Sequence, residues 1–189
     1  MAGTETIALL ELLREDRRTH GRLAWARPGF HALVVHRLTT WQRHGRGPFV
    51  VRLLIRLLSP ALSFFVRAFY GIEIALDTEI GRRFYIAHQN GMMIGAERIG
   101  DDCIVRHNVS IAGATSDGAR PVIGNRVNIG TGVVILGPIT IGDGTKIGPN
   151  SVVTRSVPAR SLVVAPAARI LTAPDAGIAA ESTTESPSR

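Results

Sequence analysis

A repeat of six residues constrains the fold of this chain more than any other feature. Counting in sixes from Ile99 to Val153 reaches ten positions, and all except Asp117 are Ile or Val. A helix has a period of 3.6 and a half-buried strand a period of two, so neither repeats at every sixth residue. Hexapeptide repeats are typical of a parallel β-helix, in which each unit forms one short strand and one turn. We therefore predict a solenoid in which three units close one coil.

The repeat is irregular at two places. Residues 113–120 around Asp117 are small, polar and rich in turn formers, which indicates a loop that leaves the coil wall. On the other side of Ile99 the aliphatic positions continue at Ile74, Ile80 and Ile86. The pattern then slips by one residue between His88 and Gly91. Irregular backbone on a rigid scaffold often carries function, so both places are candidate sites.

The first 70 residues differ in composition from the repeat and carry the excess positive charge. They contain 11 Arg against four acidic residues, and the whole chain has a net charge of +7. Apolar residues at helical spacing predict helices over residues 4–20, 28–44 and 48–70. The arginines are scattered along these helices and form no basic run. We expect solvated helix faces, and no nucleic-acid partner.

Residues 49–70 have the length of a membrane span. However, Arg52, Arg56 and Arg67 recur along the segment, and each arginine near a bilayer centre costs about 2.5–3.5 kcal/mol. We expect no transmembrane segment, and an amphipathic helix buried against other helices or a partner subunit. Contact with a membrane surface is the alternative. The first 16 residues do not resemble a signal peptide, and we expect a cytoplasmic protein.

The predicted fold class is mainly β, a parallel β-helix preceded by an N-terminal α-helical segment. We expect a helical domain over residues 1–70 and the β-helix over residues 71–171. Residues 172–189 are rich in Ala, Ser, Thr, Pro and Glu without periodicity, and we expect a disordered tail.

Several short motifs in this chain are similar to those of a known protein family. They lie at residues 28–33 (PGFHAL), 71–74 (GIEI), 88–95, 129–132 (IGTG) and 136–139 (LGPI). With them, residues 10–170 resemble the hexapeptide-repeat acyltransferases, most closely the serine O-acetyltransferases and the related polysaccharide-cluster O-acetyltransferases. The resemblance implies a left-handed β-helix, acetyl-CoA as co-substrate without a metal, a small-molecule hydroxyl acceptor, and a homotrimer or a dimer of trimers.

The resemblance also implies roles for individual residues. His88 matches the general base that takes the proton from the acceptor hydroxyl, and Glu73 matches the acidic residue that orients it. The alternative for His88 is a solvated loop histidine. Around acetyl-CoA the matching positions are Gly113, Ala114, Gly130, Thr131 and Arg169. Of these, the Gly113 region would supply backbone N–H donors to the oxyanion.

The acceptor site departs from the family. Ala87 stands where serine O-acetyltransferases have Asp, and Arg120 provides one cation where they have Arg and His together. His107 is either a second functional histidine or a surface residue. Serine and a non-serine hydroxyl both stay open as acceptors, and we predict poor turnover of serine because the missing charges hold its ammonium and carboxylate groups.

Other functions are compatible with the same fold. A sugar or polysaccharide-precursor O-acetyltransferase would use the same chemistry on another acceptor. A non-catalytic β-helix scaffold or binding protein would need neither His88 nor Glu73. A metal site of the γ-carbonic-anhydrase type needs three histidines, and the predicted solenoid contains only His88 and His107.

Overall fold

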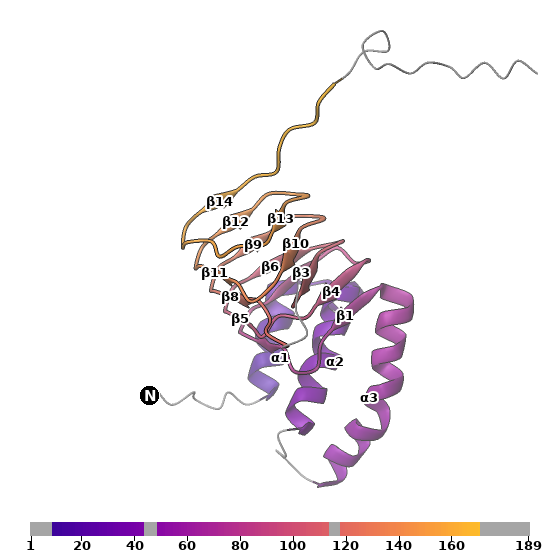
Figure 1. The fold of residues 1–189 in the computed structure, drawn as a ribbon. Coiled ribbons are helices and arrows are strands. Elements are labelled where there is room, and N and C mark those ends of the chain that lie inside the picture. The colour runs from indigo at the N-terminus through magenta and orange to yellow at the C-terminus, as the bar shows by residue number, and fades with distance from the viewer. Residues whose placement is uncertain (1–8, 44–48, 114–117, 171–189) are drawn as a thin grey trace, which may run out of the picture.

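Three helices precede the repeat in the computed structural model, which describes residues 9–43, 49–113 and 118–170 (Figure 1). The helices are α1 (Leu9–His20), α2 (Pro28–Arg43) and α3 (Phe49–Tyr70), with a short 3₁₀ turn, η1 (Ala24–Ala26), between the first two. They agree with the predicted helical segments; the expected start of the first, at residue 4, lies outside the described residues. The three helices lie side by side below the first coils of the solenoid (Figure 1).

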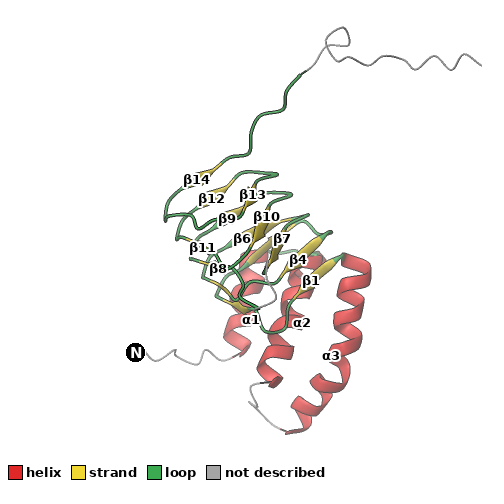
Figure 2. Ribbon diagram, viewed as in Figure 1, coloured by secondary structure: helices red, strands yellow, loops and turns green. Residues whose placement is uncertain are grey.

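Short parallel strands build the solenoid, and they form three sheets (Figure 2). Sheet A contains β1 (Ile72–Ile74), β4 (Met92–Ile94), β7 (Ser110–Ala112), β10 (Val134–Leu136) and β13 (Val152–Val153). Sheet B contains β2 (Glu79–Ile80), β5 (Arg98–Ile99), β8 (Val122–Ile123) and β11 (Thr140–Ile141). Sheet C contains β3 (Tyr85–Ala87), β6 (Ile104–Arg106), β9 (Asn128–Ile129), β12 (Lys146–Ile147) and β14 (Leu162–Val163). The chain visits the sheets in the order A, B, C, which confirms the predicted parallel β-helix.

The repeat positions form the core of the prism. All nine aliphatic positions between Ile99 and Val153 are at most 4% exposed. Strand pairing stacks them in columns, so that Ile111 lies between Ile94 and Ile135 in sheet A. Burial of one such side chain stabilises the fold by roughly 1.5–3 kcal/mol. Asp117, the exception in the repeat, lies outside the described residues.

The predicted slip near His88 consists of two opposite irregularities. The core residues Ile86 and Ile94 are eight positions apart instead of six, whereas Ile94 and Ile99 are five apart. The corner between sheets C and A therefore contains two extra residues, and the following corner contains one fewer. Strand pairing sets His88 opposite His107 and Gly91 opposite Asn108, so Gln89 and Asn90 are the extra residues. The backbone at this corner is left-handed, with φ of 65° at His88 and 100° at Asn90. Non-glycine residues rarely adopt this conformation, and it is often found at functional sites.

A ladder of side chain to backbone hydrogen bonds runs along the corner between sheets B and C. The N–H of Arg82 donates to Asp101 Oδ1 at 2.8 Å, and the N–H of Asp101 donates to Asn125 Oδ1 at 2.9 Å. The N–H of Asn125 then donates to Asp143 Oδ1 at 2.8 Å. Each coil thus accepts a hydrogen bond from the coil before it, which fixes the stacking register.

Buried polar groups attach the helices to the first coil. The Arg37 guanidinium pairs with Asp16 and also donates to the backbone carbonyls of Ile80 and Gly81. His20 Nδ1 donates to the Asp16 carbonyl at 2.8 Å, so that Nε2 is free to accept from the N–H of Ile86 at 3.4 Å. Burial lowers the pKa of His20, which keeps this acceptor neutral. The helices therefore hold β3, the strand that leads into His88.

Helix α3 corrects one expectation. We predicted that it would be buried against other helices or a partner subunit, but Val66 is its only buried residue within this chain. The side that packs against α2 and β1 is mixed, whereas most of the large apolar residues face outward; this inner side carries Arg52, Ile55, Ser59, Ser63, Val66 and Tyr70. The helix is therefore only partly buried within the chain, and burial against a partner subunit stays a prediction. By length and composition α3 is also apolar enough to cross a bilayer.

Candidate active site

Two predicted histidines lie together at the corner between sheets C and A. We call His88, His107 and Thr131 the histidine corner. The rings of His88 and His107 are 5.7 Å apart between centroids and perpendicular to each other. The N–H of Gly132 donates to the His107 carbonyl at 3.1 Å, which places Thr131 on the next coil beside His107. His88 is exposed, and Nδ1 of His107 is buried without a partner among the described residues.

The local backbone explains how the corner forms. Gly91 follows the two extra residues with φ of 63°, and a Cβ there would lie 2.4 Å from Asn108 Oδ1. Both features favour glycine at this turn. Asn108 in turn donates its N–H to the Asn90 carbonyl at 3.0 Å, which ties the irregular coil to the next one. The wide turn that presents His88 is consequently held from both sides.

Beside the histidine corner, sheet C offers a small side chain and a cation. Ala87 pairs in register with Arg106. The Arg106 guanidinium turns to the following coil, where it donates to Asn128 Oδ1 at 2.6 Å. The space next to His88 on its own strand is therefore occupied only by a methyl group.

A cavity continues from this corner along sheet C. Its volume is about 390 Å³, and it is lined by Arg106, Gly130, Thr131, Lys146 and Leu162 among others. Lys146 and Arg106 make this cavity positive, and neither forms an ion pair within the described residues. The arrangement suits a long ligand with anionic groups. Gly130 and Thr131 are residues predicted from the sequence, whereas neither cation was predicted to line a cofactor site; the two cations share sheet C because β6 pairs with β9 and β9 pairs with β12.

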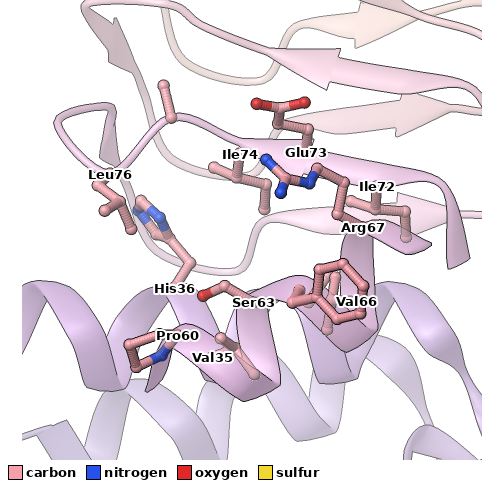
Figure 3. Close-up of a pocket in the computed structure, with 13 residues that line it drawn as sticks. Val35, His36, Pro60, Ser63, Val66, Arg67, Ile72, Glu73, Ile74 and Leu76 are labelled. Atoms are coloured by element: carbon pink, nitrogen blue, oxygen red, sulfur yellow. The ribbon is translucent and has the colours of Figure 1, made fainter. Parts of the chain in front are cut away.

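Glu73 lies elsewhere, at the junction with the helices. It lines a cavity of about 280 Å³ between α2, α3 and β1, together with Arg67 and His36 (Figure 3). The Arg67 side chain extends from α3 toward Glu73 (Figure 3). His36 Nε2 donates to the Thr78 carbonyl at 3.1 Å, and burial lowers the pKa of His36 to about 4. Within the described residues, no hydrogen bond joins Glu73 to His88.

The predicted residues of the excursion lie at the corner between sheets A and B. Arg120 pairs with Asp77 at 2.8 Å, and this hydrogen bond is the main reason that the pKa of Asp77 is lowered. A Cβ on Gly113 would lie 2.6 Å from the Ala119 carbonyl oxygen, so the two ends of the excursion are in contact. Ala114 lies outside the described residues. Arg169 is exposed beyond β14.

The structure thus brings together one part of the predicted site. Ala87, His88, His107, Gly130 and Thr131 lie along the corner between sheets C and A. Glu73, Gly113, Arg120 and Arg169 lie at other places on the same chain. Asp77, the partner of Arg120, was missed in the sequence, although both residues fall in the corner between sheets A and B.

Comparisons with known proteins agree with this architecture. Residues 120–155 match the family described as bacterial transferase hexapeptide (six repeats). A serine acetyltransferase of Helicobacter pylori is 37% identical over 170 residues, which cover 87% of this chain and 95% of that protein. The serine acetyltransferase of Mycobacterium tuberculosis is 39% identical over 142 residues, or 72% of this chain, but these span only 58% of that protein.

A solved structure shows the same likeness in three dimensions. The isoform 3 serine acetyltransferase of Entamoeba histolytica, in complex with cysteine, superposes with a TM-score of 0.70 and 27% identity, covering 87% of this chain and 61% of that one. The predicted family is therefore confirmed by sequence and by structure. The chain belongs to the serine acetyltransferase family of hexapeptide-repeat transferases.

Proposed function

We propose that this protein is an acetyl-CoA-dependent O-acetyltransferase in which His88 is the general base. The observation that carries the proposal is the position of His88. Its imidazole is exposed on a left-handed turn and contacts the imidazole of His107, and Thr131 beside His107 lines a positively charged cavity. A scaffold or binding protein has no need for two imidazoles in contact beside a positively charged cavity.

The chemistry requires a base because a hydroxyl is a poor nucleophile near neutral pH. His88 takes the hydroxyl proton while the oxygen attacks the thioester carbonyl of acetyl-CoA. The tetrahedral intermediate then expels the CoA thiolate, which takes the proton back from the imidazolium. Backbone N–H groups of residues 113–114 are the proposed donors to the oxyanion. His107 contacts His88 and is placed to bind the acceptor.

The cavity on sheet C fits acetyl-CoA as the co-substrate. Lys146 and Arg106 suit its phosphate groups, and Arg169 would add a third cation from the chain beyond β14. Gly130 and Thr131 lie where the cavity meets the histidine corner, which is the place for the acetylated sulfur. Acetyl-CoA is a cytoplasmic metabolite, so we propose a cytoplasmic reaction.

L-serine is the acceptor that the names of the relatives suggest. A second candidate is a larger hydroxyl compound with less charge, such as a sugar or a polysaccharide precursor. The observation that favours the second candidate is that Ala87, beside His88, offers no carboxylate to the ammonium group of serine, and that Arg120 is already paired with Asp77. Either acceptor would be held at the histidine corner.

We further propose that the enzyme is a homotrimer, in which two trimers can associate. The histidine corner and the Arg120 corner occupy different edges of one prism. A neighbouring prism would bring its Arg120 corner against the histidine corner and so complete the site. Glu73 would orient His88 after a side-chain rotation, because no hydrogen bond joins them in the described chain.

The test is an assay for thiol release from acetyl-CoA with L-serine, L-homoserine and monosaccharides as acceptors. We expect His88→Ala to lower kcat by about 10²–10⁴-fold while the KM for acetyl-CoA stays unchanged. Gln89→Ala, at the exposed neighbouring position, is the control and should keep full activity. Near-full turnover by His88→Ala would refute the mechanism, and an inactive His107→Ala beside an active His88→Ala would assign the base to the other histidine.

A further inference from the structure

Helix α3 presents an apolar surface that nothing in the proposed reaction uses. Its outward residues include the exposed Phe49, Leu54, Leu57, Leu58 and Phe65, and Leu57 is 66% exposed. Seen down the helix axis, successive residues are about 100° apart, and Pro60 and Leu62 mark the two edges of the exposed apolar face. This face covers roughly 200° of the helix circumference. A helix that packs against one partner helix needs an apolar stripe of only about 100°. The wide face therefore suits an extended apolar environment better than a single helix.

One edge of this face is strongly basic. Residues 28–70, which include α2 and α3, contain six Arg and no Asp or Glu. Arg43, Arg52 and Arg56 line a cavity of about 480 Å³ between the two helices, together with Gln42 and Ser59. None of these arginines forms an ion pair among the described residues, and Nε of Arg52 is buried there without a partner.

We propose that α3 lies in the surface of an anionic phospholipid bilayer. Its apolar face enters the boundary between headgroups and acyl chains, and the cavity of Arg43, Arg52 and Arg56 binds a lipid phosphate. This arrangement is that of an interfacial amphipathic helix, with apolar residues on one side and arginine beside them. Each arginine near an anionic surface adds to the attraction.

Charge decides between a bilayer and a second copy of the chain. Contact between two copies along α3 would place the arginines of one helix pair near those of the other. Since residues 28–70 supply no carboxylate, α2 and α3 of one copy would offer no opposite charge to the arginines of the other, which disfavours that contact. An anionic lipid surface supplies them. The helix also lies alongside α2 (Figure 1), so one of its sides stays on the protein and it lies on the membrane instead of crossing it.

The test is flotation of the full chain with vesicles of phosphatidylcholine, with and without phosphatidylglycerol. We expect the wild-type protein to float with the anionic vesicles. The partition coefficient of the double variant Leu54→Gln/Leu57→Gln should be at least about ten-fold lower. Val152→Gln/Val164→Gln is the matched control, because these two residues are equally exposed apolar positions at the far end of the solenoid. Arg56→Gln should lose about five-fold on anionic vesicles and nothing on neutral ones.

Three outcomes would overturn the proposal. The first is a wild-type protein that stays unbound with both vesicle types. The second is equal flotation of Leu54→Gln/Leu57→Gln and wild type. The third combines two results: the wild type does not float, and the double variant Leu54→Gln/Leu57→Gln has half the wild-type mass in sedimentation equilibrium. In that case α3 would be a contact between copies of the chain. Circular dichroism of each variant verifies that the exposed substitutions leave the fold intact. None of these readouts depends on acetyl transfer.

Discussion

Replacing Arg37 by leucine tests the contact that joins the helices to the β-helix. The Arg37 side chain is 6% exposed, and its Nε donates to Asp16 Oδ2 at 3.1 Å. The other two guanidinium nitrogens donate to the carbonyls of Ile80 and Gly81. Asp16 is fully buried, and Oδ1 has no partner among the described residues. Burial raises the pKa of Asp16, and Arg37 opposes this shift.

The expected cost follows from what the leucine leaves behind. Removing one partner of a buried ion pair costs about 3–5 kcal/mol, because the other charge stays buried and unpaired. The two carbonyls lose their donors as well, at about 1 kcal/mol each. We therefore expect Arg37→Leu to lower the free energy of unfolding by at least about 4 kcal/mol. Asp16→Leu/Arg37→Leu removes the stranded carboxylate too and should recover about half of that loss.

The measurement is urea unfolding followed by far-ultraviolet circular dichroism at pH 7.5 and one fixed protein concentration. Arg83→Leu serves as the control, because the ion pairs of Arg83 with Glu15, Asp101 and Asp102 are all partly exposed and their loss together should cost about 1 kcal/mol. The reasoning is refuted if Arg37→Leu costs no more than Arg83→Leu. It is also refuted if the double variant is as unstable as the single one.

Three further predictions concern pH, packing and the turn at the site. The pKa of His36 is lowered to about 4 by burial, so the folded protein binds fewer protons than the unfolded chain between pH 6.5 and 4. Stability should fall by about 2 kcal/mol from pH 7.5 to pH 5 through this group, and His36→Asn should remove that part of the pH dependence in urea titrations. Ile135→Ala, at a fully buried core position, should lower the unfolding free energy by about 2–5 kcal/mol, whereas an equally stable variant would contradict the packed core. Gly91→Ala should reduce kcat more than thermal stability, because the clash with Asn108 displaces the turn that carries His88; unchanged kinetics would show that this turn is not needed.

The fold could be predicted from the sequence because its core is periodic. Each aliphatic repeat position has the same environment in every coil, so one rule assigns Ile99 and Ile147 alike. Both are buried as that rule requires. The helices were equally readable, since Pro28 and the glycines near residue 45 mark their ends. Periodicity does not predict which face of α3 packs inward, because that depends on the residues that α2 and the first coil present to it.

The candidate site was only partly predictable for a related reason. His88, His107 and Thr131 fall at one corner because each coil returns to the same edge of the prism, although the two coils between them differ in length. The sequence shows only a net slip of one residue near His88. It does not show that one corner gains two residues while the next corner loses one. The ion pair of Arg120 with Asp77 joins residues from distant coils across the excursion. Finding it required counting the coils on both sides of an insertion whose length the repeat does not define.

The hydrogen-bond ladder along the corner of sheets B and C gives the solenoid a direction. Every rung donates from an earlier coil to a side chain in a later coil, from Arg82 to Asp101 and onward to Asp143. Shortening the solenoid from its C-terminal end therefore exposes a backbone N–H donor, whereas shortening it from the other end exposes a carboxylate or amide acceptor, and water satisfies either group at an exposed end. The two ends thus present different groups to an added coil. The coil that follows Asp143 has Ala159 at this corner, so the ladder stops there although the prism continues to β14. An Asp or Asn at position 159 is therefore the condition for extending the ladder.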